Sequence, residues 1–274
     1  MTVKSRYIDD EDITVTFGKR GPNQLPDFCN IVVGDDYLYS GYTDFHGPFI
    51  CAATDDINGD SAVVAFTGGN HNYANDGSLD HSATARCVSL AYYADNIRLS
   101  DGNSGWFDFI RIEWVNRVQG WNTKRVGGSG REILEERHVL EYDGKIWRSY
   151  VEIEALEDIT IDTYYGFQCV LNDYWNQVKL VGGNLSCAIS RFENAASGNS
   201  LPNALVAYGD KHRIIMEIDR SFGLGTGNMY DGTNGCFVCG EKGYFWLIKD
   251  QLLFKGEIQY ARASYKFEAV ISSD

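Results

Sequence analysis

The sequence contains no long apolar run, and no stretch approaches the roughly 18 apolar residues of a membrane-spanning helix. Residues 1–15 also lack the apolar segment of a cleavable secretion signal. Positive charge is scarce, because 24 Lys and Arg residues stand against 38 Asp and Glu, a formal net charge of −14. This balance disfavours nucleic acid and anionic membrane surfaces as partners. We therefore expect no nucleic-acid partner, no membrane insertion, and synthesis in a cytoplasm.

Several motifs that assign chemistry directly are absent as well. There is no Gly-x-Ser-x-Gly nucleophile elbow and no His-Glu-x-x-His metal motif. The 7 cysteines are odd in number, and a chain of 274 residues needs no disulfide framework to fold. Cys236 and Cys239 have zinc-knuckle spacing, but no second close pair accompanies them. We interpret these two cysteines as thiols on a strand.

Alternation of apolar and polar residues is the strongest signal that is present. It recurs in residues 109–115, 149–154 and 211–219, and 14% of the chain is aromatic. Residues 84–94 and 130–140 fit either a helix or a strand, and we favour strands. The pattern predicts an all-β, single-domain antiparallel β-sandwich over residues 1–274, up to the size of a supersandwich. Residues 1–25 are expected to form a peripheral or assembly segment.

Residues 66–73 form the richest candidate loop for binding a ligand. Amide and imidazole groups beside an aromatic face suit the hydroxyls and C–H face of a sugar. A polar surface loop whose side chains satisfy its own turns is the alternative interpretation. The predicted ligand-binding residues are Asn70, His71, Asn72, Tyr73, Trp121 and Asn122.

Three residues are candidates for catalysis. His46 precedes Gly-Pro and lies near Asp44, so it is either an oriented acid/base or a structural hydrogen-bonding group. His71 could act in the same way. Glu152 and Glu154 are two residues apart and share a strand face, which suits either a glycosidase cleft or an ordinary exposed face.

Metal binding has weaker support in the sequence. Asp56, Asn58 and Asp60 resemble the first ligands of a calcium loop, yet Thr67 stands where an EF-hand requires glutamate. A plain turn is the simpler interpretation. We expect no cofactor, with calcium in a sandwich loop as the alternative that the sequence leaves open.

Five patches together resemble β-rich modules of phage tail-fibre and baseplate proteins. They are residues 44–50, 66–71, 118–123, 153–168 and 219–225. The resemblance implies a receptor-binding virion protein that contacts host-surface glycan and assembles with other phage tail subunits as a homo-oligomer. It carries no catalytic residues over to this chain, and it favours a binding module over an enzyme.

Two other functions remain open. The first is a polysaccharide-active enzyme on a β-sandwich, such as a lyase, a glycosidase or an epimerase-like protein. The second is a purely structural virion subunit, whose loops would contact other subunits instead of sugar.

Overall fold

The computed structural model describes residues 1–8, 11–47, 50–54, 66–73, 81–100, 102–123, 130–182, 186–188, 195–196, 201–230, 235–239 and 241–270. Within these ranges the chain is all-β apart from two short 3₁₀ helices, η1 (Trp121–Thr123) and η2 (Gly223–Thr226). None of the described helices is long and apolar enough to cross a membrane. The prediction of an all-β antiparallel sandwich is confirmed.

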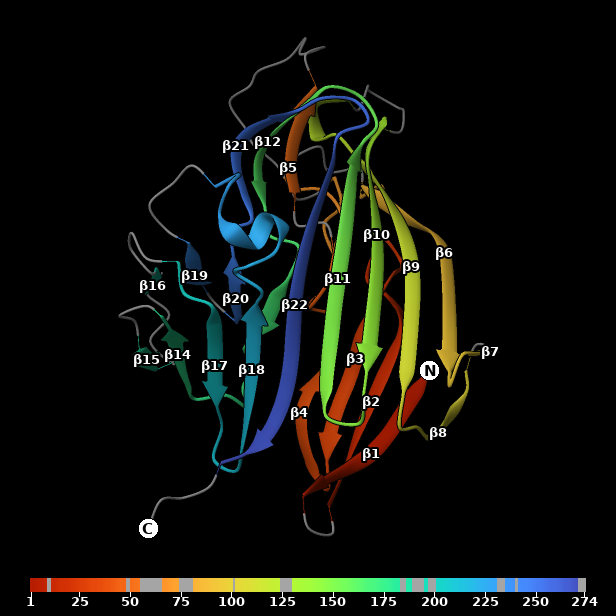
Figure 1. The fold of residues 1–274 in the computed structure, drawn as a ribbon, viewed down its shortest axis with the longest axis vertical. Coiled ribbons are helices and arrows are strands. Elements are labelled where there is room, and N and C mark those ends of the chain that lie inside the picture. The colour runs from red at the N-terminus through yellow and green to blue at the C-terminus, as the bar shows by residue number, and fades with distance from the viewer. Residues whose placement is uncertain are drawn as a thin grey trace.

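The largest element is a sheet of ten antiparallel strands, which faces the viewer in Figure 1. Its strand order is β15 (Ser186–Ala188), β14 (Gln177–Val181), β17 (Ala204–Tyr208), β18 (His212–Ile218), β22 (Ile258–Ala269), β11 (Ile146–Ala155), β10 (Glu132–Tyr142), β9 (Ile110–Gln119), β6 (Ala85–Ala94) and β7 (Ile97–Leu99). Strands distant in sequence are therefore neighbours, since β22 lies between β18 and β11.

The described residues also form three smaller sheets. The five-stranded sheet has the order β4 (Asp36–Ser40), β3 (Leu25–Val33), β2 (Glu11–Arg20), β1 (Thr2–Ile8) and β8 (Ser104–Trp106), with β1 and β8 parallel. The three-stranded sheet has the order β21 (Ile248–Leu253), β12 (Ile159–Tyr164) and β5 (Ile50–Thr54). The four-stranded sheet has the order β13 (Gln168–Val170), β20 (Lys242–Phe245), β19 (Cys236–Cys239) and β16 (Ala195–Ala196).

The five-stranded sheet packs against the ten-stranded sheet through aromatic side chains, and Figure 1 shows it behind β9 to β11. Phe17 of β2 lies 5.3 Å from Trp114 of β9, and Phe28 of β3 lies 5.3 Å from Trp147 of β11, between ring centroids. Residues 1–25, for which a peripheral segment is predicted, supply β1, β2 and the start of β3, and they bury Val3 and Phe17 in this core.

The two segments whose sequence fits either a helix or a strand are strands in the structure. β6 and β10 cover most of residues 84–94 and 130–140, so the preference for strands is confirmed. Val151 and Ile153 are fully buried, as the alternation in β11 predicts. Asp143-Gly144 joins β10 to β11, and the Asp143 carboxylate accepts from the N–H groups of Lys145 and Ile146. Side-chain hydrogen bonds of this kind make aspartate favourable in a turn.

Candidate functional site

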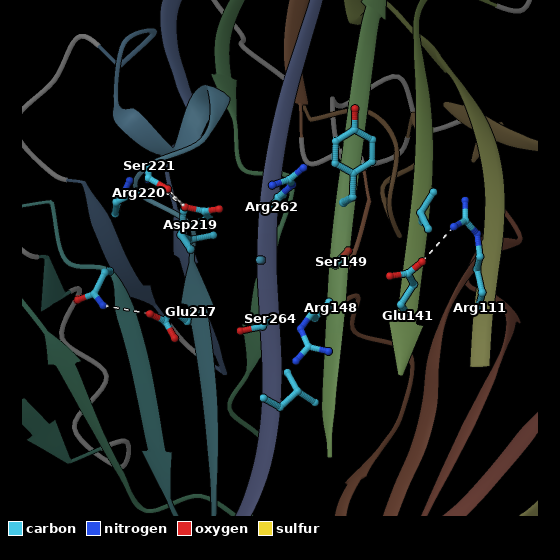
Figure 2. A pocket seen from close by; sticks show the side chains of 16 residues that line it. Arg111, Glu141, Arg148, Ser149, Glu217, Asp219, Arg220, Ser221, Arg262 and Ser264 are labelled. Carbon is cyan, nitrogen blue, oxygen red and sulfur yellow. Dashed lines mark hydrogen bonds and ion pairs between the residues drawn. The ribbon is translucent and has the colours of Figure 1, made fainter. Parts of the chain in front are cut away.

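A groove of about 930 Å³ crosses the outer face of the ten-stranded sheet, on the side away from the five-stranded sheet. We call it the outer groove. Figure 2 shows that β9, β10, β11, β22 and the end of β18 supply its side chains. Its charged lining residues are Arg111, Glu141, Arg148, Glu217, Asp219, Arg220 and Arg262. Alternation creates this lining, because the residues between them point into the core.

Arg262 of β22 is the exposed cation at the centre of the groove. Its guanidinium carbon lies 3.7 Å from the centroid of Phe222 and 6.0 Å from that of Tyr150. Tyr260, two residues earlier on the same strand, lies 6.1 Å from Tyr150 in a stacked arrangement. Within the described residues, Arg262 forms no ion pair or hydrogen bond. Its donors are therefore oriented by aromatic faces while remaining available to a ligand.

Two carboxylates lie on the same outer face as Arg262, with Asp219 opposite Arg262 and Glu217 opposite Ser264. Glu217 is exposed and accepts a hydrogen bond of 3.3 Å from the side-chain amide of Asn203. Asp219 accepts from the hydroxyl and the backbone N–H of Ser221, at 2.6 and 3.0 Å. These Ser221 hydrogen bonds, with help from Arg262, lower the pKa of Asp219. The side of the groove near β18 therefore offers hydrogen-bond acceptors beside the donors of Arg262.

On the opposite side of the groove the arginines already form ion pairs with carboxylates of the protein. Arg111 donates to Glu113 at 2.6 Å and to Glu141 at 3.0 Å, and Arg148 donates to Asp143 at 2.5 Å. Exposed pairs of this kind contribute little stability, about 0–1 kcal/mol each. They do fix the positions of both arginines along that edge of the groove.

The turn between β18 and η2 holds the groove wall in place. Arg220 is half-buried and donates to the carbonyls of Pro202 and Gly225, which anchors this turn to the preceding loop. A Cβ at Gly225 would collide with the carbonyl oxygen of Asp219, and a Cβ at Gly223 would collide with that of Tyr260. Glycine is required at both positions because the backbone of η2 packs directly against its neighbours.

His46, a predicted acid/base, lies in the interior with 2% of its surface exposed. Its Nδ1 lies 2.9 Å from Oδ1 of Asp27, so its carboxylate partner is Asp27 and not the neighbouring Asp44. Burial lowers the pKa of His46, and the Asp27 carboxylate opposes this only in part. This geometry fits His46 as a structural hydrogen-bonding group better than as an acid/base exposed to a substrate.

The loop from Phe66 to Tyr73 is pinned to the fold by its backbone. Asn23 donates to the carbonyls of Gly69 and His71, at 2.9 and 2.5 Å, and Asp44 accepts from the N–H of Asn70 at 2.7 Å. His71 stacks on Phe66 with ring centroids 5.2 Å apart, and burial lowers its pKa to about 4.

Tyr73 does not offer a ring to solvent, since it is 1% exposed and donates to Gln119 at 3.2 Å. Asn72 forms a β-bridge with Ala83. Trp121 is half-buried in η1, and Asn122 is the next residue of that helix. These positions do not adjoin the outer groove.

The remaining predicted residues are placed elsewhere. Glu152 and Glu154 do share the outer face of β11, but both are paired with Arg137, at 2.5 and 3.0 Å. The calcium candidates Asp56, Asn58 and Asp60 lie outside the described residues. Among the described residues no group of three His, Cys, Asp or Glu side chains could hold a metal. Cys236 is buried and Cys239 half-buried on β19, where residues three apart point to opposite faces.

Sequence reasoning missed the outer groove although one signal was available. Residues 211–219 alternate, and the inward set was assigned to the core. The outward set of the same strand includes Glu217, and Asp219 follows on the same face. No local pattern showed that β22 and β11 would lie beside them.

No protein-family model matches the chain, and no curated protein sequence matches it. Solved structures do share its fold. The GH36 alpha-galactosidase AgaA of Geobacillus stearothermophilus, solved with raffinose, is 10% identical with a TM-score of 0.51, covering 98% of this chain and 41% of that one. The Slr1438 protein of Synechocystis sp. PCC 6803 is 9% identical with a TM-score of 0.49, covering 98% and 96%. A protein of Escherichia coli K12 described as an aldose 1-epimerase is 10% identical with a TM-score of 0.41, covering 98% and 99%.

The similarity to AgaA shows a shared β-sandwich fold, and the chain spans less than half the length of that alpha-galactosidase. The solved structures also correct the resemblance to phage tail-fibre and baseplate modules. That resemblance is wrong, because no phage protein is among the matches. The virion role inferred from it is wrong with it. Short patches rich in aromatic, glycine and asparagine residues reflect turns and half-buried strands, which unrelated β-proteins share.

Proposed function

We propose that this chain is a carbohydrate-active protein and that the outer groove binds a neutral saccharide. The observation that carries the proposal is the placement of Arg262, held over Phe222, beside the acceptors Glu217 and Asp219. Sugar hydroxyls both donate and accept, so a site that binds them needs both kinds of group. A half-buried ring such as Tyr150 supplies the apolar surface for the C–H face of the sugar.

Two further observations support this proposal. The groove volume of about 930 Å³ lies within the usual range of ligand pockets. The net charge of −14 disfavours polyanionic sugars over neutral ones. Part of the alpha-galactosidase shares this fold, and that protein was solved with raffinose, which makes raffinose a suitable first probe. Free aldoses serve as the simplest neutral sugars.

Replacing Arg262 with alanine is expected to weaken saccharide binding about ten- to hundredfold, because a hydrogen bond to a charged donor is lost. A glycan array followed by isothermal titration calorimetry with raffinose and free aldoses measures this. The matched control is Arg98→Ala, which removes the same charge from exposed β7. Absence of binding to any saccharide, or equal effects of the two substitutions, would contradict the proposal.

Catalysis on the bound sugar is a second candidate function. Glu217 and Asp219 are two residues apart on one face, so their Cα atoms are separated by about 7 Å. Their side chains leave the same strand face, so the two carboxyl groups can adopt the separation of about 5–9.5 Å found in a glycosidic acid/base pair. The lowered pKa of Asp219 suits the ionised member of such a pair.

Glu217→Gln is expected to reduce any such turnover at least about 100-fold, since glutamine cannot transfer a proton. Proton NMR of raffinose and of freshly dissolved aldoses, with and without protein, detects hydrolysis and anomer exchange. Arg98→Ala again serves as the control. If the wild-type protein binds sugar but leaves both reactions at their spontaneous rates, the catalytic candidate is contradicted for these sugars and the binding proposal stands.

A further inference from the structure

Four interior side chains carry polar atoms with no hydrogen-bond partner in the described part of the chain. The residues are His46, Trp114, Asn116 and His138, and each is at most 2% exposed. The unpartnered atoms are His46 Nε2, Trp114 Nε1, both side-chain polar atoms of Asn116, and His138 Nδ1. Buried polar atoms in folded proteins nearly always have a partner, either in the protein or in ordered water.

These four residues form one cluster, which we call the interior polar cluster. The Trp114 and His138 rings stack with centroids 4.6 Å apart, and the His46 ring lies 5.7 Å from Trp114. Asn116 is paired across β9 and β10 with Glu136. Glu136 in turn lies 3.3 Å from Nε2 of His138. The unpartnered atoms are thus concentrated in one region between the sheets.

In each histidine one ring nitrogen is hydrogen-bonded to a carboxylate and the other has no partner within the residues that the structure describes. Asp27 remains ionised: burial would raise its pKa, but His46 and Arg20 lower it overall. A carboxylate only accepts, so Nδ1 of His46 donates to it and Nε2 carries a lone pair. Glu136 accepts from Tyr164 at 2.8 Å and from Nε2 of His138 on its other oxygen. Nδ1 of His138, on the other side of the ring, has no partner among the described residues.

The remaining atoms require a partner that both donates and accepts. The lone pair on Nε2 of His46 and Oδ1 of Asn116 need donors, and Nδ1 of His138 needs a partner of either kind. The N–H groups of Trp114 and Asn116 need an acceptor. A bare cation cannot satisfy these N–H groups, and an anion cannot satisfy the lone pairs. Water meets both demands and is the usual occupant of a buried polar site with two to four partners.

We propose that the interior polar cluster is a binding site for ordered water that bridges His46 and His138. The bridge joins groups on three sheets: Asp27 on β3, Glu136 and His138 on β10, and Tyr164 on β12. The water completes a network that holds the sandwich layers in register. This site is separate from the outer groove, since the cluster lies on the inner faces of β9 and β10.

Asn116→Leu tests the proposal because a dry cluster and a hydrated cluster predict changes in folding stability of opposite sign. Leucine has the same branching and the same number of side-chain heavy atoms as asparagine. If the cluster is dry, the substitution removes two unsatisfied groups and stabilises the protein. If water is bound, the water loses its hydrogen bonds to Asn116, and the unpartnered nitrogens of His46 and His138 are left unsatisfied. We expect the folding equilibrium constant in urea titrations to fall about tenfold.

Thr67→Val is the matched control, since the Thr67 hydroxyl is also buried and unpartnered but lies outside the cluster. It should leave stability unchanged or raise it. Oxygen-17 relaxation dispersion counts long-lived internal waters, and we expect fewer in Asn116→Leu than in wild type. Trp114→Phe should give the same loss if Asn116→Leu does not fold. Stabilisation by Asn116→Leu, or an unchanged water count in the variant that folds, would overturn the proposal.

Discussion

Asp27→Ala is expected to lower the free energy of unfolding by about 3–5 kcal/mol. The Asp27 side chain is 1% exposed, and its two oxygens accept from Nδ1 of His46 and from the backbone N–H groups of Phe28, Phe45 and His46, at 2.6–3.0 Å. The Arg20 guanidinium lies 3.7 Å away and is also buried. Alanine leaves this buried cation without its carboxylate counter-charge. It also leaves Nδ1 of His46 and three backbone N–H groups without their acceptor. Equilibrium unfolding in urea, followed by tryptophan fluorescence, measures the loss.

The control for this prediction is a carboxylate in an exposed pair. Glu157 binds Arg131 at 3.1 Å, with side chains 32% and 43% exposed. Glu157→Ala should cost less than about 1 kcal/mol, because water replaces the lost partner. If Asp27→Ala costs no more than Glu157→Ala, then Asp27 does not organise the junction between β3 and the segment around His46.

Asp44→Asn is expected to stabilise the protein increasingly as pH rises, with a swing of about 2–3 kcal/mol between about pH 5 and pH 7. Burial, reinforced by the charge of Asp27, raises the pKa of Asp44 to about 7. In the unfolded chain an aspartate titrates near its ordinary value of about 3.9. Between these values only the folded state binds the proton, so wild-type stability falls as pH rises towards 7.

Asparagine removes this penalty because it stays neutral and its Oδ1 can still accept from the N–H of Asn70. Urea titrations of both proteins at several pH values give the difference in unfolding free energy. The difference should grow up to about pH 7 and remain constant above it. Glu157→Gln is the control, and its difference from wild type should vary far less with pH. A constant difference for Asp44→Asn would show that Asp44 is ionised throughout.

The candidate site was only partly accessible from sequence. The loop with Asn70 and His71 was singled out for its polar and aromatic content, and the structure ties its backbone to Asn23 and Asp44. Loop composition alone cannot distinguish polar groups that form hydrogen bonds within the protein from polar groups that are available to a ligand. Tyr73 was expected to face a ligand and is buried instead, because its hydroxyl reaches Gln119.

The sequence alone determined the strands and which of their side chains point inward. Val151 and Ile153 are buried and Glu152 is not, because a two-residue repeat is a property of the extended backbone itself. Only the tertiary structure decided which strands are neighbours. Arg262 meets Phe222 and Tyr150 because β22 inserts between β18 and β11, and His46 meets Asp27 from 19 residues away. These partners depend on sheet pairing, and no local pattern encodes that pairing.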